Sequence, residues 1–152
     1  MDQITSAIFT IIIIFLSGLG WTLSFYFYGV HKKTIPDIVW WIPKFLQMAK
    51  CRCGDIVESK YGKILGRSNS FWGIWYYLAL IIISAGNYFF FYPPFISILI
   101  ISILSVLFSI YLMWGLYSLR IICRTCLGVH VINILIMAVA ILRAILYSLN
   151  VT

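Results

Sequence analysis

The segment Cys123-Arg124-Thr125-Cys126-Leu127-Gly128-Val129-His130 lies where a charged part of the chain becomes an apolar helix. Arg120 and Arg124 stand at this boundary, and residues 127–142 contain no Asp, Glu, Lys or Arg. Such an apolar run is typical of a helix that crosses a bilayer. The segment therefore predicts a C-x-x-C pair in the first turn of a membrane helix, at the edge of the lipid.

The rest of the chain has the composition of a membrane protein. Of its 152 residues, 63% are hydrophobic and 10% are charged, whereas a soluble domain has roughly 25% charged residues. Crossing a hydrocarbon core takes about 20 helical residues, and four apolar stretches are long enough. These expected spans cover about residues 4–30, 68–92, 95–119 and 126–149. We predict an all-α integral membrane protein, a four-transmembrane-helix bundle in which residues 1–152 form a single membrane domain.

Residues 31–67 are the only long polar segment of the chain. Between Pro36 and Pro43 they contain the apolar run 38–42, which is too short to span the bilayer and too apolar for a free loop. The paired tryptophans of this run favour the headgroup layer. We therefore expect residues 31–67, called the lid below, to lie on the membrane surface over the mouth of the bundle.

The number of spans determines which parts of the chain meet. Four spans place both termini on one side of the membrane and put the lid and the C-x-x-C pair on the other. The lid carries Cys51 and Cys53, and the last span begins with Cys123 and Cys126. Both cysteine pairs are therefore expected at the same bilayer surface.

This layout suits thiol–disulfide exchange, in which a thiolate attacks a disulfide sulfur. A helix N-terminus and nearby arginines favour the thiolate form of a cysteine, and Cys123 has both. Cys126 lies one turn deeper, so a lipid-soluble acceptor reaches Cys126 first and the lid cysteines reach Cys123 first. The order predicts electron flow from the lid dithiol through Cys123 and Cys126 to a membrane quinone.

Two polar residues near this pair are candidate quinone ligands. His130 follows Cys126 by four residues and shares its helix face, which Asn133 continues. An ionisable residue inside a membrane helix is by default a functional candidate, although a core histidine bonded to a neighbouring helix is the alternative. Asn69, at the mouth of the second span, is a second candidate hydrogen-bond donor, and it can serve as a helix cap as well.

Three motifs together resemble the vitamin K epoxide reductase family. They are Arg67-Ser68-Asn69-Ser70-Phe71-Trp72-Gly73, similar to that family's Ser-Asn-Ser-x-x-Gly segment; Cys123-x-x-Cys126 with Ile132-Asn133, similar to its redox motif and following helix; and residues 53–62, similar to its lid pattern of Cys, Ser, aromatic and Gly. Their order and spacing cover most of the chain from Cys51 onward.

The resemblance implies a bundle around a quinone, such as menaquinone or ubiquinone, that oxidises a thioredoxin-like partner and forms protein disulfides. By motif position, Cys126 contacts the quinone, Cys123 exchanges with Cys53, and Cys51 meets the partner. Asn69 matches the family's quinone-binding Asn, and His130 falls where vertebrate members carry a quinone-binding Tyr. We expect the protein to act as a monomer in membrane lipid. Its basic residues cluster beside the spans, which favours a membrane surface over nucleic acid.

Two features depart from the family pattern, the spacing of the lid cysteines and the replacement of the Tyr by His130, which bears on the choice of quinone or substrate. Only Arg52 separates the two lid cysteines, whereas family members have several residues between them. The lid is also short, which argues against epoxide reduction as the native activity. A different class of function remains open, a zinc-binding membrane protein that uses Cys51, Cys53, Cys123 and Cys126 as a four-sulfur site. A structural zinc does not explain Asn69 or His130 deeper in the bundle.

The basic residues predict an orientation. Those on the lid face are Lys32, Lys33, Lys44, Lys50, Arg52, Lys60, Lys63, Arg67, Arg120 and Arg124. The opposite face has only Arg143, which we expect to snorkel out of the last span. Basic residues in short loops stay cytoplasmic, so we predict a cytoplasmic active-site face. Family analogy favours the extracytoplasmic alternative.

Overall fold

The structure, a computed structural model, describes residues 3–50, 53–90 and 95–149. Its long helices are α1 (Gln3–His31), α3 (Asn69–Phe90), α4 (Phe95–Leu119) and α5 (Arg124–Leu149). Within the described residues, these four are the helices long and apolar enough to cross a membrane. The prediction of an all-α, four-span membrane bundle is confirmed.

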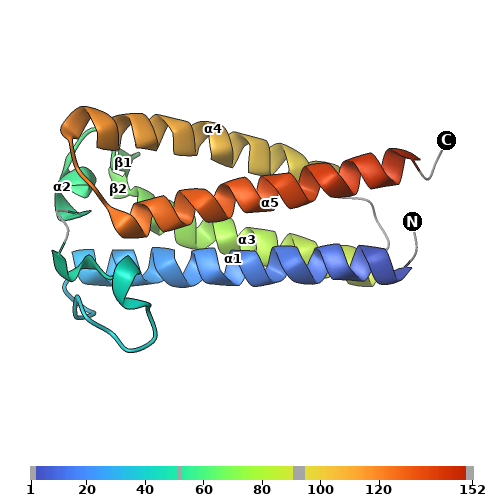
Figure 1. The fold of residues 1–152 in the computed structure, drawn as a ribbon, viewed down its shortest axis with the longest axis horizontal. Helices are drawn as coiled ribbons and strands as arrows, with labels where there is room; N and C mark the ends of the chain where they lie inside the picture. Colours follow the sequence, from blue (N-terminus) through green and yellow to red (C-terminus); the bar gives the residue numbers. More distant parts are fainter. Residues whose placement is uncertain (1–2, 51–52, 91–94, 150–152) are drawn as a thin grey trace.

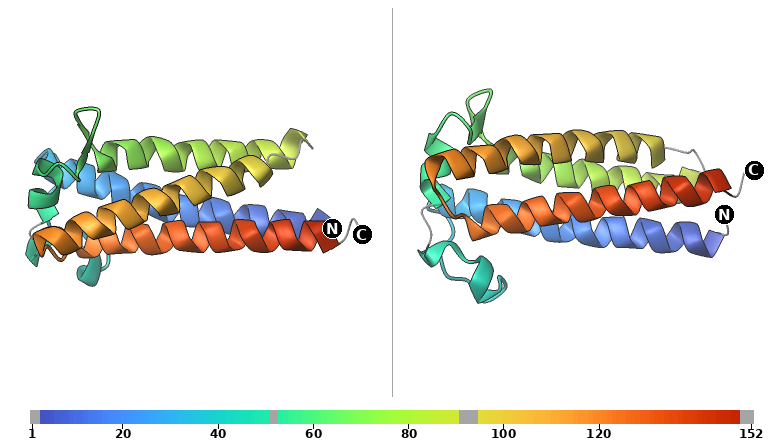
Figure 2. Two further views of the ribbon diagram at one scale, coloured as in Figure 1. Left: turned by 90° about the horizontal axis from the view of Figure 1, so that it is seen from above. Right: turned by 45° about the horizontal axis from the view of Figure 1, so that its top comes forward.

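The four long helices run along one common axis (Figure 1). Both ends of the chain lie at one end of the bundle, and the lid and the start of α5 lie at the other, as the number of spans predicted. Helix α1 packs against α3 and α5, α5 also packs against α4, and α3 touches α4 only weakly. Figure 2 shows α3 and α4 diverging toward the lid end. The bundle is therefore most open beneath the lid.

Small residues let the helices approach one another. A Cβ atom on Gly20 of α1 would lie 2.3 Å from the ring of Tyr77 on α3, so the absence of a side chain is what admits this ring. Gly18, which could have served the same purpose, has no heavy atom within 4 Å of its Cβ position.

The two helices that end at the lid face stop in the same way. Just after α1, Lys33 has φ 59°, and Thr34 N donates to Gly29 O at 2.9 Å. Just after α4, Arg120 has φ 51°, and Ile121 N donates to Leu116 O at 3.0 Å. Both are Schellman caps, in which a left-handed residue turns the chain out of the helix. Basic residues take this position here, where glycine is usual.

The lid consists of short elements. Its 3-10 turns are η1 (Lys44–Leu46) and η2 (Met48–Lys50), and α2 (Cys53–Glu58) follows. Strands β1 (Lys63–Ile64) and β2 (Arg67–Ser68) then pair antiparallel. The two residues between the strands, Leu65 and Gly66, both have positive φ, which is the geometry of a tight type I′ hairpin turn.

Buried polar contacts fasten the lid to the bundle. The Tyr26 hydroxyl of α1 donates to the Asp37 carbonyl and accepts from Met48 N at 3.0 Å. On the other side, Thr125 Oγ1 of α5 donates to Leu46 O at 2.6 Å. Of the paired tryptophans, Trp40 is 95% exposed, while Trp41 packs edge-on against Tyr26 at 5.8 Å between ring centroids. One tryptophan thus anchors the lid and the other faces outward.

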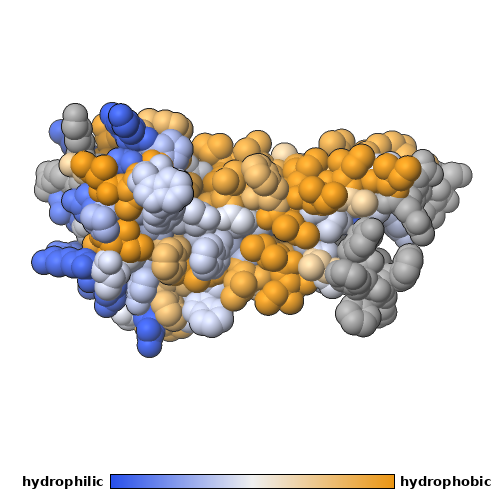
Figure 3. Space-filling model, turned by 90° about the horizontal axis from the view of Figure 1, so that it is seen from below, coloured by the Kyte–Doolittle hydropathy of each residue, from blue (hydrophilic) through white to orange (hydrophobic). Residues whose placement is uncertain are grey.

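The surface separates into a polar end and an apolar body. Figure 3 shows hydrophilic residues gathered at the lid end and hydrophobic ones along the rest of the bundle. The sequence prediction that Arg143 snorkels outward needs correction. Its side chain is buried, and Nη2 donates to Ser6 Oγ of α1 at 3.0 Å. A hydrogen-bond partner inside the bundle holds this guanidinium in place.

Candidate functional site

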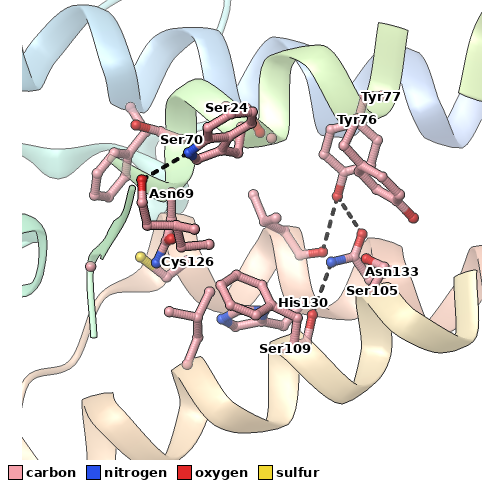
Figure 4. Close-up of a pocket in the computed structure, with 18 of the residues that line it drawn as sticks. Ser24, Asn69, Ser70, Tyr76, Tyr77, Ser105, Ser109, Cys126, His130 and Asn133 are labelled. Carbon is pink, nitrogen blue, oxygen red and sulfur yellow. Dashed lines mark hydrogen bonds between the residues drawn. The ribbon is translucent and has the colours of Figure 1, made fainter. Parts of the chain in front are cut away.

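A cavity of about 370 Å³ lies beneath the lid. All four long helices and α2 contribute to its wall, which is largely apolar. Its polar lining residues are Ser24, Asn69, Ser70, Tyr76, Tyr77, Ser105, Ser109, Cys126, His130 and Asn133 (Figure 4). An apolar cavity with a few convergent polar groups is the usual form of a small-molecule site.

The two cysteines of the C-x-x-C pair have different surroundings. Cys123 immediately precedes α5 and caps it, because its carbonyl accepts from Leu127 N at 3.0 Å and its Sγ accepts from Cys126 N at 3.4 Å. Cys123 is fully buried and does not line the cavity, whereas Cys126 does. Both are free thiols. The pair thus has one sulfur at the cavity and one at the helix start.

Of the two lid cysteines, Cys53 lies within the described residues. Cys53 begins α2, is fully buried and takes part in a disulfide. Since Cys123 and Cys126 are free thiols, this disulfide does not link the lid to α5. Cys51 lies outside the described residues. Ile56 and Val57, one turn further along α2, line the cavity, so the helix that carries Cys53 forms part of its wall.

Asn69 is the first residue of α3, and its side chain lies at the lid end of the cavity (Figure 4). Its Nδ2 donates to Tyr61 O at 2.8 Å, and its Oδ1 is buried without a partner among the described residues. Ser68 caps the helix instead, because Ser68 Oγ accepts from Phe71 N at 3.4 Å. Asn69 itself is therefore not the cap, and its Oδ1 is a buried acceptor at the cavity wall without a partner among the described residues.

His130 lines the middle of the cavity, between Cys126 and Asn133 (Figure 4). The side chain is 6% exposed, and neither ring nitrogen has a partner among the described residues. Buried polar atoms are normally hydrogen-bonded. The alternative of a core histidine needs a bond to a neighbouring helix, and the described residues provide none. The described residues thus leave both ring nitrogens buried at the cavity wall without a hydrogen-bond partner.

A hydrogen-bonded chain closes the deep end of the cavity. The Tyr77 hydroxyl donates to Asn133 Oδ1 at 2.6 Å, and Asn133 Nδ2 donates to Ser109 Oγ at 2.9 Å. The chain joins α3, α5 and α4. Sequence reasoning noticed Asn133 and missed Tyr77 and Ser109. The available signal was the spacing of Ser102, Ser105 and Ser109, which places three hydroxyls on one face of an apolar helix.

The zinc alternative finds no support in the described part of the chain. In residues 3–50, 53–90 and 95–149, no group of three or more His, Cys, Asp or Glu side chains is placed to hold a metal ion. A four-sulfur site would also need Cys51, which lies outside those ranges.

The chain matches a known protein family over the region that contains the site. The chain matches the vitamin K epoxide reductase family over residues 11–141. A search of curated proteins gave no match. The family match extends from α1 to α5 and includes the cavity, the lid and both cysteine pairs. The chain therefore belongs to the vitamin K epoxide reductase family, whose members are membrane oxidoreductases that link thiols to quinones in general.

Proposed function

We propose that the protein generates disulfides in a thioredoxin-like partner and delivers the electrons to a membrane quinone. Electrons pass from the partner to Cys51 and Cys53, then to Cys123 and Cys126. One observation carries the proposal. Cys126, Asn69 and His130 line the same cavity, and among the described residues Asn69 Oδ1 and both His130 ring nitrogens have no hydrogen-bond partner.

The cavity suits a quinone in size and chemistry. A volume of about 370 Å³ with apolar walls fits a quinone ring. An N–H of neutral His130 can donate to a quinone carbonyl, and Asn69 Oδ1 can accept from the hydroxyl of the reduced form. Leu104 and Trp72 line the cavity and are also 60% and 38% exposed on the apolar surface. The wall thus reaches the lipid, from which a menaquinone, ubiquinone or related molecule would enter.

The proposed chemistry is a two-electron oxidation. As the Cys123–Cys126 disulfide forms, the two thiols give up two electrons and two protons, which a bound quinone takes up. Cys126 is the sulfur at the cavity, so Cys123 is left to exchange with Cys53. Both Cys53 and Cys123 are fully buried, so this exchange requires α2 to move relative to the start of α5.

The function is tested by assaying quinone reduction with two electron donors, a reduced thioredoxin-like protein and dithiothreitol. We expect activity with both. A Cys51→Ser variant should lose activity with the protein donor and keep substantial activity with dithiothreitol, because Cys51 serves only the entry from the partner. Equal loss with both donors would contradict the order of the relay, and no quinone reduction with either donor would refute the function.

His130→Phe is expected to raise the KM for quinone or lower turnover by about three- to tenfold. The reason is the loss of one hydrogen bond, with a net contribution of about 0.5–1.5 kcal/mol. Val131→Phe is the matched control, because Val131 is the next residue of α5 and is 55% exposed on the outer face. If the quinone kinetics are unchanged in His130→Phe, or change equally in both variants, His130 does not bind the quinone.

We further propose that the lid face is cytoplasmic, because of the basic residues around it. Cysteines introduced at two exposed positions, Lys33 on the lid face and Ser148 at the other end, test this in a background without native cysteines. In intact cells, a membrane-impermeant maleimide should label Ser148→Cys and leave Lys33→Cys unlabelled until the cells are permeabilised. The reverse pattern would establish the extracytoplasmic orientation.

A further inference from the structure

A second cleft, of about 510 Å³, opens on the lid face outside the cavity described above. It lies between the C-terminal end of α1 and the β1–β2 hairpin. Its most polar lining side chains come from both walls. His31 and Lys32 belong to the end of α1, and Lys63, Arg67 and Ser68 belong to the hairpin.

The charge around this cleft is of one sign. Lys32, Lys63 and Arg67 carry positive charges, and no Asp or Glu is among the described residues that line it. Like charges gathered around one space repel one another, and an anion between them relieves that repulsion. The Arg67 guanidinium is held 4.7 Å above the ring of Phe71, which fixes it at the rim. The cleft thus favours a ligand with a compact negative charge.

The position of the cleft narrows the choice of anion. It lies where α1 ends and α3 begins, which is the boundary of two membrane spans. Apolar side chains lie directly beside the charges. Leu65 at the hairpin turn is 87% exposed and lines the cleft, and Phe71 packs against Trp75, which is 56% exposed. A ligand here meets cations with one part and an apolar surface with another.

We propose that this cleft binds the phosphate headgroup of an anionic membrane phospholipid. The basic residues take the phosphate, and Leu65 and the Phe71–Trp75 surface contact the upper part of the acyl chains. Because the phosphate would contact both α1 and the hairpin, it would hold the hairpin against α1. Val57 lines this cleft and the quinone cavity alike, so the bound lipid would stand against the wall of the redox site.

The test measures lipid binding to the purified protein in neutral detergent, by native mass spectrometry and by the shift in unfolding temperature. The probes are a short-chain phosphatidylglycerol, the matching phosphatidylcholine and inorganic phosphate. We expect saturable binding of phosphatidylglycerol alone. Lys63→Gln/Arg67→Gln should weaken that binding by about tenfold, because each basic residue near an anionic lipid contributes about fivefold before screening by salt.

The control is Lys33→Gln/Lys44→Gln, which removes the same charge from two exposed lysines of the same face that do not line the cleft. It should bind phosphatidylglycerol as the unaltered protein does. If Lys63→Gln/Arg67→Gln folds poorly without lipid, the Lys32→Gln variant is used instead. Its affinity for phosphatidylglycerol should fall by about threefold. Equal weakening in the control, unchanged binding in the cleft variants, or equal binding of phosphatidylcholine would overturn the proposal. If inorganic phosphate raised the unfolding temperature as much as phosphatidylglycerol does, the cleft would be a site for a soluble anion, and the proposal of a lipid site would be wrong.

Discussion

Cys126→Ser is expected to abolish quinone reduction with every electron donor, by at least about a thousandfold, which is the scale seen when a nucleophile is removed. Cys126 is the cysteine that lines the cavity, while Cys123 caps α5 and lies outside it. A serine hydroxyl cannot form the disulfide that releases the two electrons. The measurement is quinol formation with dithiothreitol as donor, which bypasses the partner.

The same variant should still bind quinone, because His130 and Asn69 remain in place. Quenching of the protein's tryptophan fluorescence provides the binding signal, because Trp72 lines the cavity. Lost turnover with retained binding would place Cys126 in the chemistry. Lost turnover with lost binding would indicate a collapsed cavity, and residual turnover above about a tenth of the original would show that another thiol serves the quinone.

Gly62→Ala is expected to displace the lid and to lower quinone reduction by tenfold or more. A Cβ at Gly62 would lie 1.9 Å from the Ile56 carbonyl oxygen and 2.6 Å from Val57 Cα. Both are backbone atoms of α2, so no rotation of a side chain relieves the clash. Overpacking of this kind costs about 1–3 kcal/mol or more. Gly62 O also accepts from Asn69 N at 3.0 Å, so the movement would reach a candidate quinone ligand.

The matched control is Gly54→Ala in α2, where the added Cβ meets nothing within 4 Å. Alanine in a helix is favoured over glycine by about 0.5–1 kcal/mol, so this variant should be as stable as the original or more so. Limited proteolysis measures how far the lid is displaced in each variant, and the quinone assay measures the loss of activity. Equal proteolysis rates and equal activities in both variants would show that α2 does not hold Gly62 as the structure has it.

The lid could be predicted from the sequence only in part. Residues 31–67 are recognisable as a surface segment from their polarity and prolines. The β1–β2 hairpin is not, because each strand has only two residues. Elements this short have little intrinsic stability. They are held by contacts with the bundle, such as those of Tyr26 with Asp37 and Met48.

The sequence by itself determined the four spans, the meeting of the lid with the start of α5, and the family. These follow from local properties, since apolar length decides whether a helix crosses lipid and an even number of spans decides which ends meet. Only the tertiary structure decided that Asn69 Oδ1 and the His130 ring nitrogens have no hydrogen-bond partner among the described residues, because that depends on every side chain packed around them. The bond from Tyr77 to Asn133 joins residues 56 positions apart. No local pattern encodes such a pair, and it forms because the packing of α3 against α1 places the Tyr77 ring over Gly20.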